Sequence, residues 1–381
     1  MKWEKKKLCE CTEYITDGDH QPAPKADKGV HFIKIKDIVN NQVSFDAQVY
    51  VPQEYYDNLP MERKPQKEDV LYTVVGSFGI PSYVQTDELF CFERNIALLH
   101  PNKDIEPRFL YYSLKNPAFY KGVEIVANGS AQKLIPLSKL KDLKILVPDK
   151  EAQRHIADIL SAYDDLIENN QKQIKLLEEA ARRLYKEWFV DLRFPGHENT
   201  KIVDGVPEGW SVYPFSSKVD IMSGGTPKTS IPDYYNGKIP FYTPKDSDGA
   251  FFAYKTQINI TEGGLKNCNS RLYPPKTVII TARGTVGKTT ILAVPMAMNQ
   301  SCYALKMKEN DAPYYLFFAL NNEIKALQTM ANGGVFNTII GKTFDSINIQ
   351  IPKDPLIYGF EKTVRPFMEQ IKISYKQIQS L

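Results

Sequence analysis

The fold of this chain is decided by residues 150–189, which read KEAQRHIADILSAYDDLIENNQKQIKLLEEAARRLYKEWF. Apolar residues recur here at alternating steps of four and three, which is the spacing of a coiled-coil seam. The seam of this segment contains Ile156, Leu160, Tyr163, Ile167, Asn170, Ile174, Leu177, Ala181, Leu184 and Trp188. The pattern predicts one long helix that pairs with another helix.

A second stripe with the same spacing lies near the end of the sequence. It contains Phe360, Val364, Phe367, Ile371, Ser374, Ile378 and Leu381, each 204 residues after a seam position of the first stripe. Either stripe alone also fits an amphipathic helix that packs on its own domain. Because the two stripes are in register, we expect them to pair with each other.

The polar interruption of the two stripes also coincides, since Ser374 is equivalent to Asn170. A polar residue on a coiled-coil seam commonly fixes the register at some cost in stability. We expect Asn170 and Ser374 to have this role, in which they could face each other. The second stripe stops at Leu381, the equivalent of Leu177, so the second predicted helix is shorter than the first.

Outside the helices, short motifs recur in the same order in both halves of the chain. The pairs are Ala127–Ser130 with Ala331–Gly334, Ile145–Pro148 with Ile349–Pro352, Gly76–Gly79 with Gly284–Gly287, and Phe32 and Lys36–Asp37 with Phe241 and Lys245–Asp246. Small loop insertions explain why the offset drifts between 204 and 209 residues. The sequence therefore predicts an internal duplication of one domain.

Each copy has the composition of a mixed domain, α/β or α+β. β-rich runs at 30–35, 70–75, 239–243 and 277–281 alternate with turns, and helical stretches are expected at 107–121 and 313–329. The predicted organisation is a first target domain at 1–149, a long helix at 150–190, a linker at 191–206, a second target domain at 207–354 and a second helix at 355–381. The linker is too short to carry the chain back along the first helix, so the two helices are expected to form an antiparallel coiled coil that separates the domains.

The bulk composition fits a folded protein with several cores. The chain has 381 residues, of which 43% are hydrophobic and 24% charged, and a net charge of +3. No run of about eighteen apolar residues occurs, so we expect a cytoplasmic protein without a membrane partner. The five cysteines show neither a disulfide framework nor zinc-binding spacing and are expected to be reduced. The net charge of +3 is only mildly basic, so it permits a polyanionic partner without requiring one.

Several local motifs make the chain similar to a known family. They are Asp17–His20, Gly76–Gly79, Asn128–Gln132, the helix start Glu151–Ser161, Trp188–Asp191 and Val206–Trp210. In this order they resemble the specificity subunits of type I restriction-modification enzymes, over essentially the whole chain.

The resemblance implies a non-catalytic subunit that binds double-stranded DNA. Each of its two target recognition domains would read one half of an asymmetric, bipartite site. The helices would set the spacer and dock two methyltransferase (M) subunits, which restriction and translocase (R) subunits join. S-adenosylmethionine, ATP and Mg would belong to these partner subunits, so no cofactor, metal or catalytic residue is expected in this chain.

Residues for DNA binding are expected in the polar and glycine-rich turns that recur in both copies, because cations contact phosphates and polar side chains read base edges. The candidates are His20, Gln21, Lys25, Ser77, Gln132 and Lys133 in the first copy, and Thr226, Lys228, Thr229, Arg283, Lys288 and Asn337 in the second.

Three motifs suggest other chemistry. Residues 282–289 read ARGTVGKT, a permissive phosphate-binding loop, but the following TTILAVP is not a helix start, so a nucleotide-binding enzyme is a weaker alternative. Asn116–Phe119 is similar to a methyltransferase motif but lacks a glycine-rich cofactor loop before it. His20 with Asp17 and Asp19 lacks a third metal ligand. A coiled-coil scaffold that binds only proteins is the remaining alternative.

Overall fold

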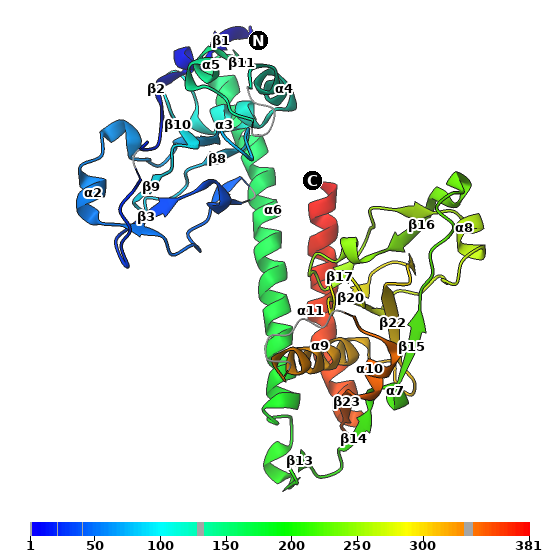
Figure 1. The fold of residues 1–381 in the computed structure, drawn as a ribbon. Helices are drawn as coiled ribbons and strands as arrows, with labels where there is room; N and C mark the ends of the chain where they lie inside the picture. The colour runs from blue at the N-terminus through cyan, green and yellow to red at the C-terminus, as the bar shows by residue number, and fades with distance from the viewer. Residues whose placement is uncertain (1, 21, 40, 128–132, 331–337) are drawn as a thin grey trace. The chain divides into compact units, whose positions relative to one another are not determined.

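The structure, a computed structural model, describes residues 2–20, 22–39, 41–127, 133–330 and 338–381. By its internal contacts the chain divides into two units, Met1–Leu166 and Ile167–Leu381. The boundary lies inside the long helix α6 (Lys150–Tyr185), so the first turns of α6 belong to unit 1 and its later turns to unit 2 (Figure 1).

Unit 1 is built on two small sheets. The larger is antiparallel, with the order β2 (Thr12–Asp17), β10 (Ile96–Pro101), β7 (Val70–Thr73) and β8 (Pro81–Tyr83). The smaller has the order β6 (Tyr50–Val51), β3 (Val30–Ile33) and β9 (Phe90–Phe92). Two further pairs are β1 (Glu4–Lys7) with β11 (Lys144–Val147), and β4 (Ile38–Val39) with β5 (Gln42–Val43). The helices are α1 (Leu8–Cys11), α2 (Gln53–Asp57), α3 (Pro107–Lys115), α4 (Pro117–Val126) and α5 (Leu137–Asp142).

The central strands of unit 1 are apolar on both faces because both faces are covered. Val70 and Tyr72 of β7 belong to the cluster that contains Phe109 and Leu110 of α3. The intervening Leu71 belongs to a second cluster with residues of β9 and β3. A near-continuous apolar run in β7 is therefore what a strand between a helix and a second sheet requires.

Unit 2 repeats this arrangement. Its main sheet has the order β15 (Val219–Ser223), β22 (Cys302–Met307), β19 (Val278–Thr281), β20 (Thr289–Leu292) and β17 (Phe252–Ala253). Its smaller sheet has the order β18 (Asn259–Ile260), β16 (Tyr235–Tyr242) and β21 (Ala297–Met298). Two further pairs are β14 (Ser211–Pro214) with β23 (Asn348–Ile351), and β12 (Ile202–Val203) with β13 (Val206–Pro207). The helices are α7 (Phe215–Lys218), α8 (Glu262–Lys266), α9 (Pro313–Met330), α10 (Gly341–Asp345) and α11 (Asp354–Ser380).

The strand registers show that the two units contain copies of one domain. Ala97 of β10 pairs with Asp17 of β2, and Tyr303 of β22 pairs with Ser223 of β15. In the smaller sheets, β3 with β9 and β16 with β21 are both parallel pairs. The duplication and the mixed architecture predicted from the sequence are thus confirmed.

Helices α6 and α11 pack together within unit 2, and they run antiparallel (Figure 1). Near one end, the ring of Phe360 lies 5.9 Å from that of Trp188. Further along, the Ser374 hydroxyl donates to the Gln173 Oε1 at 2.8 Å. The residue numbers therefore fall along α6 while they rise along α11. The pair also rests on the core of its own domain, because Ala181, Tyr185 and Phe360 share one cluster with Tyr315 and Phe318.

Several seam residues lie elsewhere than the periodicity suggested. Ile156 packs against the core of unit 1, and Leu160 and Tyr163 are 38% and 49% exposed. Asn170 is buried, but its Nδ2 has no hydrogen-bond partner among the described residues, and Ser374 binds Gln173 instead of Asn170. The repeat offset pairs equivalent positions in sequence, whereas an antiparallel pair brings together positions that the offset does not relate.

Each long helix is tied to its own domain by a side chain that accepts from the start of a domain helix. In unit 1 the Gln153 Oε1 accepts from the Glu106 N–H at 2.9 Å, next to the first residue of α3. In unit 2 the Glu361 Oε1 accepts from the Tyr314 and Tyr315 N–H groups, both at 2.8 Å, in the first turn of α9. Such contacts satisfy amide groups that a helix leaves unpaired at its start.

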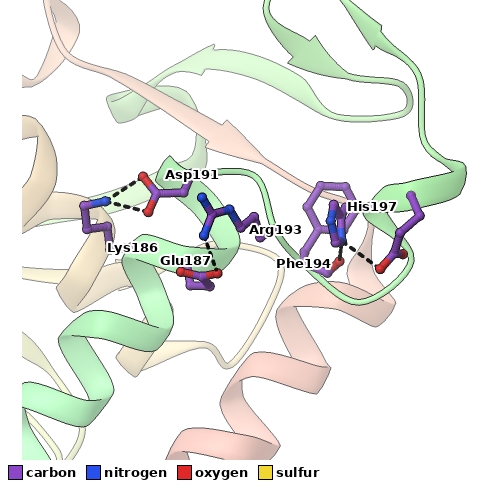
Figure 2. A network of polar contacts seen from close by, with 7 residues as sticks. Lys186, Glu187, Asp191, Arg193, Phe194 and His197 are labelled. Atoms are coloured by element: carbon purple, nitrogen blue, oxygen red, sulfur yellow. Dashed lines mark hydrogen bonds and ion pairs between the residues drawn. The ribbon is translucent and has the colours of Figure 1, made fainter.

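The chain leaves α6 through a short π-helical turn, Lys186–Val190, that two ion pairs hold (Figure 2). The Lys186 Nζ lies 2.6 Å from the Asp191 Oδ1, and the Arg193 guanidinium lies 3.2 Å from the Glu187 carboxylate. The His197 Nδ1 then donates to the Phe194 carbonyl oxygen at 2.9 Å. The segment expected to be a linker is therefore locally structured.

The stretch expected as one helix at 107–121 is two helices, α3 and α4. The break is at Asn116, whose Oδ1 accepts from the Ala118 N–H at 2.8 Å, with Pro117 at the first position of α4. Asn116 thus acts as a helix cap, and proline is tolerated after it because that position needs no N–H. Of the helices in the described residues, none is long and apolar enough to cross a membrane.

Candidate DNA-recognition site

A glycine hairpin follows the third strand of the main sheet in both copies. Gly76 and Gly79 have φ of 72° and 82°, and Gly284 and Gly287 have φ of 79° and 81°. A Cβ on Gly79 would lie 2.5 Å from the Tyr120 ring. The repeated glycines of the sequence are therefore required by backbone conformation in both copies, and by close packing at Gly79.

Equivalent threonines hold the two hairpins. The Thr73 hydroxyl donates to the Ser77 carbonyl at 2.7 Å, and the Thr281 hydroxyl donates to the Thr285 carbonyl. Arg283 and Lys288 flank the second hairpin and are exposed. In the first copy, Lys133 lies beside the hairpin, where its carbonyl accepts from the Gly76 N–H and its Nζ lies 5.3 Å from the centre of the Phe78 ring.

A second loop in each copy follows the edge strand of the main sheet, β2 in unit 1 and β15 in unit 2. It packs against the turn that connects the smaller sheet to the main sheet. A Cβ on Gly18 would lie 2.1 Å from the Phe92 carbonyl oxygen, and one on Gly224 would lie 2.3 Å from the Asn299 carbonyl oxygen. Only glycine allows this approach without a shift of the backbone. His20 and Thr226 therefore occupy equivalent positions in the two copies, each two residues after a buried glycine.

In unit 1 this loop borders a hollow with a cavity volume of about 410 Å³. We call it the domain-1 hollow. Among the residues that line it are His20, Lys25, Phe32, Lys34, Tyr50 and Arg94. Apolar walls and a basic rim are the features of a surface that accepts a group carrying both apolar and anionic parts.

The two acidic residues that line the domain-1 hollow, Asp19 and Glu93, have partners within the protein. The Asp19 carboxylate accepts from the Tyr55 hydroxyl at 3.0 Å and lies 3.4 Å from Arg63, and the Glu93 Oε1 accepts from the Ile35 N–H at 2.8 Å. Burial, together with the hydrogen bond to Asp19, raises the pKa of Tyr55 to about 12, so this hydroxyl keeps its proton.

The cations of the same hollow have no such partners. Among the described residues, none forms a hydrogen bond or an ion pair with the charged groups of the Lys25, Lys34 and Arg94 side chains. The hollow is thus lined by two acids, Asp19 and Glu93, and by three cations, Lys25, Lys34 and Arg94, and this excess of positive charge suits an anionic group.

The structure brings most of the expected DNA-binding residues into these loops. His20 and Lys25 line the domain-1 hollow, where His20 lies 3.1 Å from Asp17. Ser77 and Lys133 lie at the first glycine hairpin. In the second copy Thr226, Lys228 and Thr229 are exposed on the equivalent loop. Gln21, Gln132 and Asn337 lie outside the described residues.

Lys34 and Arg94 were not among the expected residues. Lys34 follows β3, and Arg94 lies in the turn between β9 and β10. Lys34 lies inside the repeated stretch Phe32–Asp37, but the second copy has Thr243 at its position, and the stretch around Arg94 does not recur, so a search for identical motifs passes over both.

The alternative chemistries find no support in the described residues. Residues 289–292 form strand β20 directly after the second hairpin, so the phosphate-binding motif lacks the helix whose N-terminus would face a phosphate. No group of three or more His, Cys, Asp or Glu among the described residues is arranged to hold a metal ion. The Asp17–His20 pair joins the last residue of β2 to an exposed loop residue, with the His20 side chain 59% exposed.

Comparison with known proteins agrees with this geometry. The model of the type I restriction modification DNA specificity domain matches residues 1–179 and 207–356, which are the two copies of the repeat. The chain is 28% identical over 296 residues to the MjaIX specificity subunit of Methanocaldococcus jannaschii, covering 76% of this chain and 68% of the relative. It is 24% identical over 411 residues to the HindI specificity subunit of Haemophilus influenzae, covering 90% and 88%.

A solved structure has the same fold over the full length of the chain. The crystal structure of the type I restriction-modification S subunit from M. genitalium has a TM-score of 0.66, with 17% identity, and the match covers 100% of this chain and 93% of that one. Because the family model matches both copies of the duplicated domain, this chain belongs to the DNA specificity subunits of type I restriction-modification enzymes, which are themselves non-catalytic.

Proposed function

We propose that each recognition domain, 1–149 and 207–354, reads one half of an asymmetric, bipartite site in double-stranded DNA. The observation that carries the proposal is the repetition of one backbone frame with different side chains. The two glycine hairpins share their φ angles and their threonine contacts, yet Ser77 and Phe78 stand where the second copy has Thr285 and Val286. Because the two hairpins share one backbone conformation, they present their side chains to DNA in the same manner. Because the side chains differ, the two half-sites that they read differ.

Affinity in this proposal comes from the exposed cations and specificity from polar side chains. The phosphate-binding residues are Lys25, Lys133, Lys228, Arg283 and Lys288, with Lys34 added by the structure. His20, Gln21, Ser77, Gln132, Thr226, Thr229 and Asn337 are the further candidates in the same loops. Each cation that contacts a phosphate should steepen the slope of the logarithm of the binding constant against the logarithm of the salt concentration by about one.

The helices and the segment between them are proposed to dock the partner subunits. Within unit 2, a hollow of about 330 Å³ is lined by Trp188, Phe194, Trp210, Pro355 and Leu356. Aromatic side chains around a concave apolar surface are typical of the core of a protein interface. Two M subunits and the R subunits are the proposed partners, and they would supply S-adenosylmethionine, ATP and Mg.

The remaining sequence predictions concern location and spacing. A cytoplasmic location stays a prediction. The helices at 150–190 and 355–381 are proposed to set the spacer between the two half-sites. Seven residues inserted into α6 between Ser161 and Leu166 should therefore change the gap in the recognised site while both half-sites stay the same.

The test uses the complex of this chain with its M subunits. Binding to target and random duplexes is measured across a salt series by fluorescence anisotropy. We expect random DNA to lose affinity steeply with salt while the target duplex retains a specific margin, because base contacts do not release counterions. Equal affinity for target and random duplexes at every salt concentration would show that this chain does not read sequence.

A further inference from the structure

The turn between the smaller and the main sheet has the same hydrogen bonds in both copies. In unit 1 the Glu93 N–H donates to the Ile33 carbonyl, and the Val74 N–H donates to the Asn95 carbonyl at 2.9 Å. In unit 2 the Asn299 N–H donates to the Tyr242 carbonyl, and the Ala282 N–H donates to the Ser301 carbonyl at 2.7 Å. The central residues of the two turns, Arg94 and Gln300, therefore occupy the same backbone position.

This turn is anchored at both ends by buried strand residues. The strands on either side are fully buried at Phe90 and Ile96 in unit 1, and at Met298 and Cys302 in unit 2. Arg94 and Gln300 are nevertheless exposed. A side chain on a rigid element reaches its target with a better defined geometry than one on a loose loop.

The neighbours of the two side chains differ. In unit 2 the Thr226 hydroxyl donates to the Gln300 Oε1, which fixes the amide and leaves its Nε2 and the second lone pair of Oε1 available. In unit 1 the equivalent His20 interacts with Asp17 at 3.1 Å, and no described residue binds the Arg94 guanidinium. Each turn thus presents one side chain whose hydrogen-bonding groups are open toward a ligand.

We propose that Arg94 and Gln300 are equivalent base-reading residues, and that the first domain reads guanine where the second reads adenine. Guanine presents two acceptors, N7 and O6, which match the paired donors of Arg94. Adenine presents the N7 acceptor and the N6 donor, which match the Nε2 and Oε1 of Gln300. This inference rests on the proposed function, since it assigns one base pair in each half-site to the same turn.

The experiment exchanges the two side chains in the complex with the M subunits. Arg94→Gln and Gln300→Arg are made separately, and the methylated sites are mapped at base resolution in a host that carries each variant. Lys103→Gln is the matched control, because Lys103 is an exposed cation just beyond the opposite end of strand β10. Thermal unfolding of each variant checks that the fold is kept.

We expect Arg94→Gln to change guanine to adenine at one position of the first half-site, and Gln300→Arg to make the reverse change in the second. On the original duplex each variant should bind about 5- to 150-fold more weakly, and most of this loss should be recovered on the duplex with the exchanged base pair. Lys103→Gln should leave both half-sites unchanged.

The failures are distinguishable. If the unmodified complex shows no bipartite site, the proposed function fails and this assignment fails with it. If the unmodified complex reads a bipartite site and Arg94→Gln leaves the first half-site unchanged, only the assignment is overturned. An equal loss of affinity for every sequence would also overturn it, because that is the behaviour of a phosphate contact.

Discussion

Glu361 gives the protein a stability that falls as the pH rises. Its side chain on α11 is 4% exposed and caps the start of α9. Burial raises the pKa of Glu361 from 4.5 to about 7, against the opposing effect of the two backbone N–H donors and of Arg365. Asp311, which also lies near, adds to the rise.

The direction of this pH dependence follows from the number of protons that the folded and unfolded chains bind. Between pH 4.5 and about 7 the unfolded chain has lost this proton while the folded chain still holds it. The folded state binds more protons, so the free energy of unfolding decreases as the pH increases through this window. The full contribution is present below pH 4.5 and is lost by about pH 7. At about 1.4 kcal/mol for each pKa unit, the rise corresponds to about 3 kcal/mol.

The variant Glu361→Gln keeps a carbonyl oxygen for the two N–H groups and removes the titration. We therefore expect its stability relative to the unmodified protein to improve by about 2–3 kcal/mol between pH 5 and pH 8, because part of the total is already lost at pH 5. Urea unfolding at each pH is followed by tryptophan fluorescence, since Trp188 and Trp210 are partly buried and pack against the core cluster of unit 2.

Glu369→Gln is the matched control, because Glu369 is a glutamate on the same helix whose side chain is 52% exposed. It should leave the pH dependence unchanged. A difference between the unmodified protein and Glu361→Gln that stays constant from pH 5 to pH 8 would refute the assigned role of burial.

Three further substitutions test the packing. Asn170→Leu removes a buried Nδ2 that no described residue binds, so it should raise the free energy of unfolding by about 1–2 kcal/mol in urea titrations; a decrease would show that the amide contributes to stability. Phe360→Ala deletes a ring that is fully buried against Trp188 and Phe189 and should cost about 3–5 kcal/mol in the same assay, whereas the exposed Tyr358→Ala should cost little. Gly79→Ala places a Cβ 2.5 Å from the Tyr120 ring at a φ of +82° and should lower the midpoint of thermal unfolding. Gly122→Ala lies in helix α4, where the nearest atom to the new Cβ is 3.9 Å away, and should raise this midpoint. Equal shifts for the two variants would contradict the steric argument.

Most of the fold could be predicted because the chain repeats itself. The seam periodicity identified α6 and α11, and the repeated glycines identified both hairpins. Periodicity shows which face of a helix is apolar, but not what covers that face. Ile156 therefore fits the seam by spacing and packs in the core of unit 1, while Leu160 is 38% exposed.

The candidate site was predictable only where its backbone needs particular residues. Gly18 and Gly79 are visible in the sequence because no other residue fits there. The shared backbone position of Arg94 and Gln300 is revealed by their backbone hydrogen bonds, since the turns Glu93–Asn95 and Asn299–Ser301 have no identical residue at equivalent positions. A side chain that reads DNA is free to differ between copies, so repetition cannot find it.

The central claim is that each domain reads one half of the recognised site. It is tested most directly by replacing residues 207–354 with the corresponding domain of another specificity subunit and mapping the methylated sites at base resolution in a host that carries the hybrid and its partner subunits. The account predicts that the half-site read by residues 1–149 stays unchanged and that only the other half takes the sequence of the donor. A change in both halves, or in neither, would contradict it.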